Sequence, residues 1–207
     1  MIKFKVSFLF LVLFFLLYCN KESINHENSI AERNVESKVK YSDFVKILDI
    51  KTDSEKEKYF FTYINYDVPY YWKGTPWSFN GTTSEPQKES VACGYFVTNV
   101  LKNYGFKIKA SYLAQQASSV MIKQLCTDIK HFSKVSEVEK YILSKDKNQI
   151  YIVGLDFHTG FITRENKDTY FIHSNYIKNQ GPVKEKTKES KALNYSKSFM
   201  IGQIKFK

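Results

Sequence analysis

Cys93 is the residue with the clearest chemical potential, and it stands in the sequence SVACGYFVT at positions 90–98. Small residues lead into an amphipathic helical pattern, which predicts that the thiol lies on the first turn of a helix. The dipole and the free N–H groups of a helix N-terminus favour the thiolate, which is the reactive form of cysteine. The alternative is a small buried cysteine with no chemical role, as many free cysteines are.

Two histidines downstream of Cys93 could serve as its base and the support of that base. His158 and His173 both lie in segments with strand-like sequence. A cysteine on which histidines converge in space is the outline of a nucleophile with its base. In that chemistry His158 takes the thiol proton and returns it to the leaving amine, while a second polar group holds its tautomer. The alternatives are a capping or satisfied histidine at a strand end for His158, and a surface histidine for His173.

Residues 158–173 are predicted to form a β-hairpin whose turn lies within residues 164–168. A register in which paired residue numbers sum to 331 puts His158 opposite His173. A register in which they sum to 333 puts His158 opposite Asn175. Because residues two apart share a face of a strand, both registers place a polar orienting group beside His158.

These motifs are similar to those of a known family. ACGYFV at 92–97 resembles the DCSGFV motif of the NlpC-like cysteine peptidases, papain-like enzymes that cut peptide bonds in bacterial cell walls. HTGFI at 158–162 and FIHS at 171–174 resemble the base motif of that family and the hairpin after it. The resemblance implies that Cys93 is the nucleophile, His158 the base and His173 the third catalytic residue.

The resemblance spans roughly Trp77 to Asn175 and implies a papain-like fold, with the nucleophile at the start of a helix packed on a mostly antiparallel sheet. The chain departs from the family pattern at two neighbours of Cys93. Ala92 stands where the family usually has Asp, and Gly94 stands where it usually has Ser.

An oxyanion formed at Cys93 needs hydrogen-bond donors, and the backbone N–H of Cys93 is the expected one. The family often carries a Tyr upstream that supports the oxyanion, and the matching position here is Trp77, which has an indole N–H. Asn80 is the other candidate donor, and Asn175 is a further candidate for the substrate groove. Alternatively, Trp77 and Phe79 form an aromatic wall of the groove or part of the core. The sequence has no zinc-type ligand spacing, so no metal or cofactor is predicted.

The predicted elements change from helices to strands along the chain. A helix capped by Asp53 and Ser54 begins the domain, and an aromatic loop follows at 66–86, broken by glycines and prolines. Helices are predicted over 92–104, with Gly105 as the residue after the helix, over 112–125, and from Ser136, whose spacing to Glu139 is that of a capping box. Strands are predicted over 149–157, in the hairpin, and over 198–204. Helices followed by antiparallel strands are typical of the α+β class.

Residues 1–18 have the pattern of an export signal. Lys3 and Lys5 precede an apolar run over 6–18 that is shorter than the roughly 20 residues needed to span a bilayer. LLYC at 16–19 resembles a bacterial lipobox, which implies a lipidated Cys19 and an exported, membrane-anchored lipoprotein. The alternatives are a plain signal peptide cleaved elsewhere and an uncleaved anchor. Polar residues 19–42 are predicted to be a flexible tether, and 43–207 to be one domain.

The formal net charge of +10 comes almost wholly from lysine, since arginine occurs only at Arg33 and Arg164. No arginine cluster or RNA-binding motif is present, so nucleic acid is excluded as the expected partner. Cys126 ends a helical pattern and is predicted to lie in the core, without a disulfide to Cys93.

The sequence therefore predicts a monomeric, thiol-dependent hydrolase that cleaves peptide or amide bonds, most naturally those of peptidoglycan stem peptides. Two alternatives share the fold. One is a catalytically inactive module that binds the cell wall. The other is a cysteine acyltransferase or protease that acts on polypeptides through the same thioacyl intermediate.

Overall fold

The computed structural model describes residues 39–146 and 148–206. The chain divides into two units, residues 1–40 and 41–207, and the described residues belong almost wholly to the second. The predicted signal peptide, Cys19 and nearly all of the predicted tether lie outside the described residues. Within the described part, none of the helices is both long enough and apolar enough to cross a membrane.

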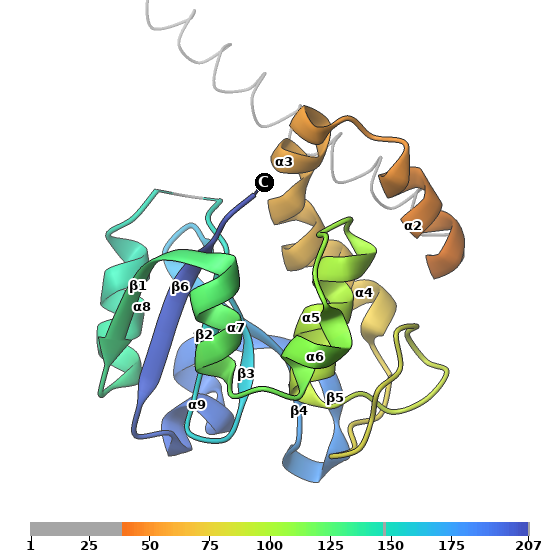
Figure 1. Ribbon diagram of the computed structural model, residues 1–207. Helices are drawn as coiled ribbons and strands as arrows, with labels where there is room; N and C mark the ends of the chain where they lie inside the picture. Colours follow the sequence, from red (N-terminus) through yellow and green to blue (C-terminus); the bar gives the residue numbers. More distant parts are fainter. Residues whose placement is uncertain (1–38, 147, 207) are drawn as a thin grey trace, which may run out of the picture. The chain divides into compact units, whose positions relative to one another are not determined.

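An antiparallel sheet forms the centre of the second unit (Figure 1). The described residues give it six strands in the order β1-β6-β2-β3-β4-β5. The strands are β1 (Cys126–Phe132), β2 (Tyr151–Gly154), β3 (Thr159–Glu165), β4 (Asp168–Asn175), β5 (Gly181–Lys186) and β6 (Phe199–Ile204). Strands β2 to β5 follow one another as a meander, and β6 returns to lie between β1 and β2.

Helices precede the sheet and interrupt it. The α-helices are α2 (Tyr41–Asp49), α3 (Asp53–Thr62), α4 (Val68–Trp72), α5 (Cys93–Asn103), α6 (Ala110–Ala114), α7 (Ser118–Leu125), α8 (Val135–Leu143) and α9 (Lys191–Tyr195). A π-helical turn, η1 (Tyr63–Asp67), joins α3 to α4, and the short 3-10 turns η2 (Ile177–Asn179) and η3 (Thr187–Glu189) flank β5. The predicted α+β class is confirmed.

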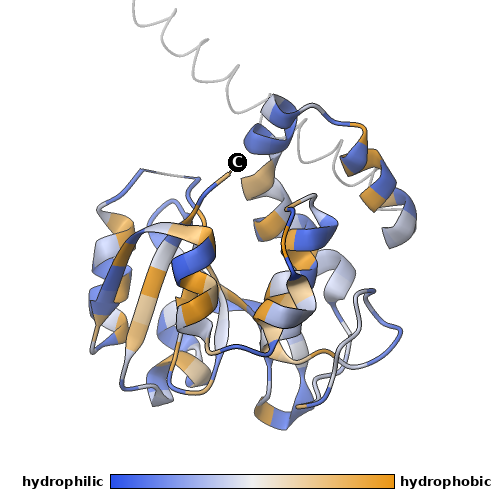
Figure 2. Ribbon diagram, viewed as in Figure 1, coloured by the Kyte–Doolittle hydropathy of each residue, from blue (hydrophilic) through white to orange (hydrophobic). Residues whose placement is uncertain are grey.

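Alternation along the strands gives the sheet two apolar faces. Ile152, Phe161 and Ile172 belong to one buried cluster, which α5 and α7 cover. Their neighbours Val153, Ile162 and Phe171 belong to a second cluster, which α8 and α9 cover. Figure 2 shows hydrophobic segments both in the strands and in the helices that cover them. Because both faces are buried, the central strands contain continuous apolar runs, such as YIV at 151–153 and GFI at 160–162.

The region after α3 differs from its prediction. Residues 66–72, expected to be loop, continue the helix through η1 and α4. Val68 and Trp72 are fully buried, so core packing holds this segment helical despite its aromatic content. Pro69 lies in the first turn of α4, where a missing N–H is tolerated.

The segment 112–125 also differs, because it forms two helices that break after Ala114 instead of one. Cys126, expected at the end of the helix, is the first residue of β1.

The predicted capping box at Ser136 is wrong. The helix α8 begins earlier, at Val135, and the carboxylate that caps it is Glu137, which accepts from the backbone N–H groups of Ser133 and Lys134. Glu139 instead accepts hydrogen bonds from threonine hydroxyls of β4 and η3. A similar shift of one residue occurs at α3, whose N-cap is Thr52 with Glu55 as its reciprocal partner.

Candidate active site

Cys93 is the first residue of α5, as predicted. Ala92 is the N-cap with extended backbone, and its carbonyl accepts the first intrahelical bond from Phe96 at 2.8 Å. The N–H groups of Cys93 and Gly94 therefore have no partner within the helix, and both interact with the thiol. Gly105 has a φ of 108° and ends the helix in the predicted role.

Gly94 has a steric reason to depart from the family motif. A Cβ at this position would lie 2.4 Å from the carbonyl oxygen of Ala114, at the end of α6. The absence of a side chain lets α6 pack against the first turn of α5. The serine of the family motif would not fit here without movement of the backbone.

We expect Gly94→Ser to lower the free energy of unfolding by about 1–3 kcal/mol, as small-to-large changes in packed sites do. Thermal unfolding followed by circular dichroism measures the effect. Ala92→Ser is the matched control, because a serine N-cap should raise the stability by up to about 1 kcal/mol. Equal stability of Gly94→Ser and the unsubstituted protein would contradict the steric explanation.

The two histidines meet at the start of the hairpin. His158 lies immediately before β3, His173 lies on β4, and both side chains are buried. The Nε2 atom of His158 is 2.7 Å from the Nδ1 atom of His173. The strands pair as Phe161 with Ile172, so the register is the one whose numbers sum to 333. The contact between the histidines is therefore diagonal, not directly across the ladder.

Gly160 makes this diagonal contact possible. It shares a strand face with His158 and lies beside His173. A Cβ on Gly160 would lie 2.7 Å from the Cβ of His173 and 2.6 Å from the ring of Phe171. The missing side chain therefore lets β3 lie close to His173, and His158 is on the same face of that strand's path.

Asn175 is placed differently from His173. Its amide donates to Gln180 at 3.0 Å and its carbonyl oxygen accepts from the N–H of Ile177 at 2.9 Å. These bonds shape the turn after β4. Of the three groove candidates, Trp77 and Asn80 line the pocket described below and Asn175 does not.

A carboxylate that the sequence reasoning missed continues the chain of hydrogen bonds. The Nε2 atom of His173 lies 3.1 Å from Oε1 of Glu185 on β5. This strand was not predicted. Its alternating sequence PVKEKT at 182–187 was the available signal, although proline and lysine gave it the appearance of a polar loop.

The resting site is uncharged at Cys93 and at both histidines. Burial, and then the neighbouring His173, lowers the pKa of His158 well below 6.5. Burial also lowers the pKa of His173, against the opposing effect of Glu185. Burial raises the pKa of the Cys93 thiol by more than the N–H groups of Thr159, Gly94 and Cys93 itself lower it. The helix N-terminus thus acts as predicted, but burial outweighs it.

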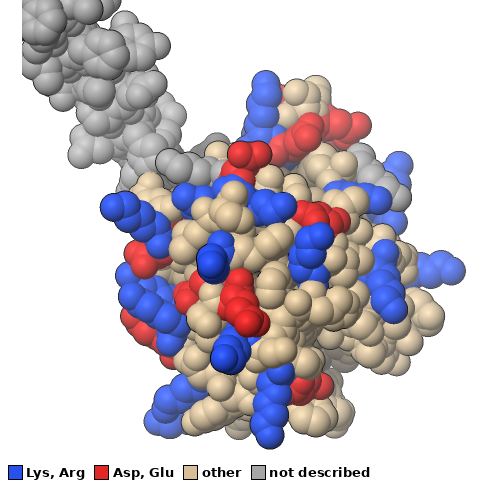
Figure 3. Space-filling view, turned by 90° about the vertical axis from the view of Figure 1, so that its left-hand side faces the viewer, with Lys and Arg blue, Asp and Glu red and all other residues tan. Residues whose placement is uncertain are grey.

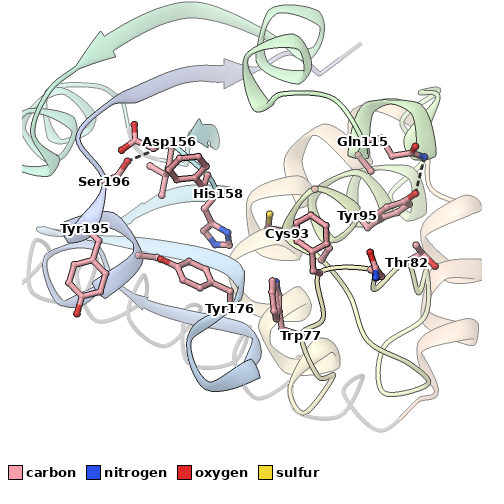
Figure 4. A pocket seen from close by; sticks show the side chains of 18 of the residues that line it. Trp77, Thr82, Cys93, Tyr95, Gln115, Asp156, His158, Tyr176, Tyr195 and Ser196 are labelled. Atoms are coloured by element: carbon pink, nitrogen blue, oxygen red, sulfur yellow. Dashed lines mark hydrogen bonds between the residues drawn. The ribbon is translucent and has the colours of Figure 1, made fainter.

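Cys93 and His158 line a pocket of about 1080 Å³, and His173 lies behind His158, outside the lining. Figure 4 shows Cys93, Trp77 and Tyr95 on one side, with His158 and Tyr176 on the other. The sulfur of Cys93 and the ring of His158 face each other (Figure 4), and the thiol interacts with the N–H of Thr159, the residue after His158. The rings of Tyr176 and His158 are 5.2 Å apart between centroids.

Trp77 lines this pocket and carries an unused donor. Its Nε1 atom is buried and has no hydrogen-bond partner among the described residues. The loop that carries it is fixed on both sides, because the carbonyl of Pro76 accepts from Val91 at 2.9 Å and the N–H of Trp77 donates to Asn179 at 3.3 Å. Buried donors are rarely left unpaired, so this N–H remains available to an acceptor.

Asp156 ties together the two loops that form the other wall. Its Oδ2 atom accepts from the N–H of Lys197 at 2.8 Å, and its Oδ1 atom accepts from the hydroxyl of Ser198. Its own N–H donates to Ser196 at 3.2 Å. The loop that carries His158 is thereby bound to the loop between α9 and β6, which sequence reasoning did not connect with the site.

Cys126 differs chemically from Cys93, although both are free thiols. It is buried on β1 beside β6, where a Cβ placed at Gly202 would lie 2.5 Å from the Cβ of Cys126. Burial raises the pKa of Cys126 to about 12. This thiol is inert near neutral pH, in keeping with its predicted place in the core.

In the described ranges, His, Cys, Asp and Glu residues do not gather into a group of three that could hold a metal ion. On the face drawn in Figure 3, lysines and arginines are interspersed with acidic side chains. The chemistry of the pocket is inferred from its own residues, because comparisons with protein-family models, curated proteins and solved structures find no match for this chain.

Proposed function

We propose that this protein is a thiol-dependent hydrolase of papain-like fold that cleaves peptide or amide bonds in peptidoglycan stem peptides. Cys93 is the nucleophile, His158 the base and His173 the residue that orients it. The observation that carries this proposal is the 2.7 Å contact between the two histidines, of which His158 lines a pocket that also holds a thiol at a helix N-terminus.

In the first half of the reaction, the thiol proton passes to His158 as the sulfur of Cys93 attacks the substrate carbonyl carbon. The bond between sulfur and carbon forms, and the carbonyl oxygen becomes an oxyanion. The N–H of Cys93 and the Nε1–H of Trp77 stabilise that charge. The carbon–nitrogen bond then breaks, and the imidazolium of His158 gives its proton to the departing amine.

The second half of the reaction hydrolyses the thioester. A water molecule enters the place that the amine has left, and His158 takes one of its protons as the oxygen attacks the acyl carbon. The carbon–sulfur bond breaks, the proton returns to the sulfur, and the carboxylic acid leaves. Cys93 and His158 are restored to their uncharged resting forms.

Peptidoglycan is proposed as the substrate because the motifs around Cys93, His158 and His173 resemble those of cell-wall peptidases. An export signal with lipidation at Cys19 would place the domain beside that polymer, anchored to a membrane. The size of the pocket is consistent with a peptide, since ligand pockets commonly range from about 300 to 1,000 Å³.

The experiment that tests the proposal is digestion of purified peptidoglycan sacculi by the purified full-length chain. Soluble peptide fragments with new amino termini, identified by mass spectrometry, are the expected result. Binding to sacculi without any released fragment would refute the hydrolase and leave the cell-wall-binding module. Transfer of the acyl group to an added amine in place of water would identify an acyltransferase.

Trp77→Phe removes one oxyanion donor and keeps the aromatic ring. We expect kcat to fall by about 100-fold, the loss typical of one such donor, while KM changes little. Initial rates of fragment release measure both. Asn80→Ala is the matched control, because Asn80 is exposed at the same pocket and is the competing donor. A large fall in kcat for Asn80→Ala, with Trp77→Phe unaffected, would move the oxyanion donor to Asn80.

A further inference from the structure

We propose that Glu185 is a positioning residue of this site, which fixes the protons on the pair of histidines and supplies the counter-charge when His158 is protonated. The inference deepens the proposed function and rests on it for its catalytic meaning. The hydrogen-bond chain from Glu185 to His173 to His158 carries it.

Glu185 is held in place by the fold. It lies on β5, where its pairing partner on β4 is Phe171. The ring of Phe171 stacks on that of His173 with 4.0 Å between centroids, so His173 and Glu185 share one face of the sheet. A hydrogen bond with Ser190, the N-cap of α9, holds the carboxyl group from the other side.

The carboxylate determines which ring nitrogens carry protons. Burial raises the pKa of Glu185, but the hydrogen bonds with His173 and Ser190 lower it by more, so the group is ionised and can only accept. The Nε2 atom of neutral His173 must then carry the proton, which leaves its Nδ1 atom as an acceptor. His158 consequently donates from Nε2, and its Nδ1 atom is the base available to the thiol.

The same carboxylate stabilises the charged state of the reaction. When His158 takes the proton of Cys93, a positive charge forms in a buried place where it would otherwise be costly. Glu185 provides an opposite charge through one intervening ring. Two other titratable groups lie nearest His158 in the pocket, Cys93 on α5 and Tyr176 after β4. The titratable residues in the rest of the pocket lining are Tyr95, Asp156, Tyr195 and Lys197. Asp156 is already bonded to Lys197 and Ser198.

Nitrogen-15 NMR of the histidine rings tests the inference without requiring any activity. In the full-length chain near pH 7, we expect Nε2–H tautomers for both His158 and His173. In Glu185→Gln, the pKa of the imidazolium form of the pair should fall by about one unit, the lower end of the effect of a nearby opposite charge. Glu165→Gln is the matched control, because Glu165 is another partly buried sheet carboxylate with an ion pair, to Lys184.

Two results would overturn the inference. One is an Nδ1–H tautomer of His173 in the unsubstituted protein, a measurement that needs no variant. The other is an unchanged titration of the histidines in folded Glu185→Gln. Kinetics on sacculi give the catalytic readout, with kcat expected to fall about tenfold in Glu185→Gln and KM unchanged. If the titration shifts but the unsubstituted protein digests no sacculi, the role of Glu185 stands and the proposed function fails. If sacculi are digested but the titration does not shift, the proposed function stands and the role of Glu185 fails.

Discussion

Cys93→Ser is expected to lower the rate of fragment release from sacculi by roughly 10⁴- to 10⁶-fold, the loss typical when a hydrolase loses its nucleophile. The hydroxyl is nearly isosteric with the thiol, but its proton is far more strongly held. Burial lowers the pKa of His158, so this imidazole is a weaker base toward that proton than a free imidazole is. Initial rates measured by quantitative mass spectrometry of the fragments check the prediction.

Cys126→Ala is the control for this substitution. It removes the other described thiol, which burial keeps protonated, and should leave the rate per folded molecule unchanged. A stable acyl adduct found on Cys93 during turnover would support its role directly. Full activity of Cys93→Ser would contradict it, and so would an adduct found on a different residue.

His158→Gln is expected to lower kcat by about 10⁴-fold, because the general base is lost. Glutamine can still form a hydrogen bond with His173, so the hairpin should keep its register. The exposed His131→Gln on β1 is the matched control and should retain full activity. Activity of His158→Gln within a few-fold of the unsubstituted protein would assign the base to another residue.

The lowered pKa of His158 determines the direction in which the free energy of unfolding changes with pH. Its pKa in the folded state is lower than its unfolded value of about 6.5, so the unfolded state takes up protons first as the pH falls. At His158 this uptake lowers the free energy of unfolding progressively below pH 6.5, and it has no effect on that free energy above pH 6.5. Chemical denaturation across pH 5–8 should therefore show a smaller decline in His158→Gln than in His131→Gln. The acid limb of the rate profile should likewise lie below pH 6.5.

The sequence was sufficient to predict the helix that begins at Cys93 and the hairpin that carries both histidines. It left the register open, although the turn contained the deciding information. Asn166 has a φ of 53° at the first position of the two-residue turn, and asparagine is among the few residues that accept this conformation readily. A turn centred on Asn166 and Lys167 corresponds to the observed register.

The residues that support the site could not be found in this way, because tertiary pairing places them there. Glu185 lies on β5, the edge strand of the described sheet, where Pro182 and lysines are tolerated because one side has no ladder partner among the described residues. Asp156 lies in a loop and meets residues 196–198 only because β6 is inserted beside β2. No local pattern connects segments about 40 residues apart.

The protonated resting state of Cys93 bears on how long the protein survives in an oxidising medium. Peroxides attack thiolates far faster than thiols, and the first product can proceed to acids that are not reversible. Because burial raises the pKa of the Cys93 thiol, we expect this sulfur to react with peroxides more slowly than an exposed cysteine does. Cys126 offers no repair through a disulfide, since its own thiol also stays protonated. Durability outside a reducing compartment is thus a property of the pocket walls, not of a second cysteine.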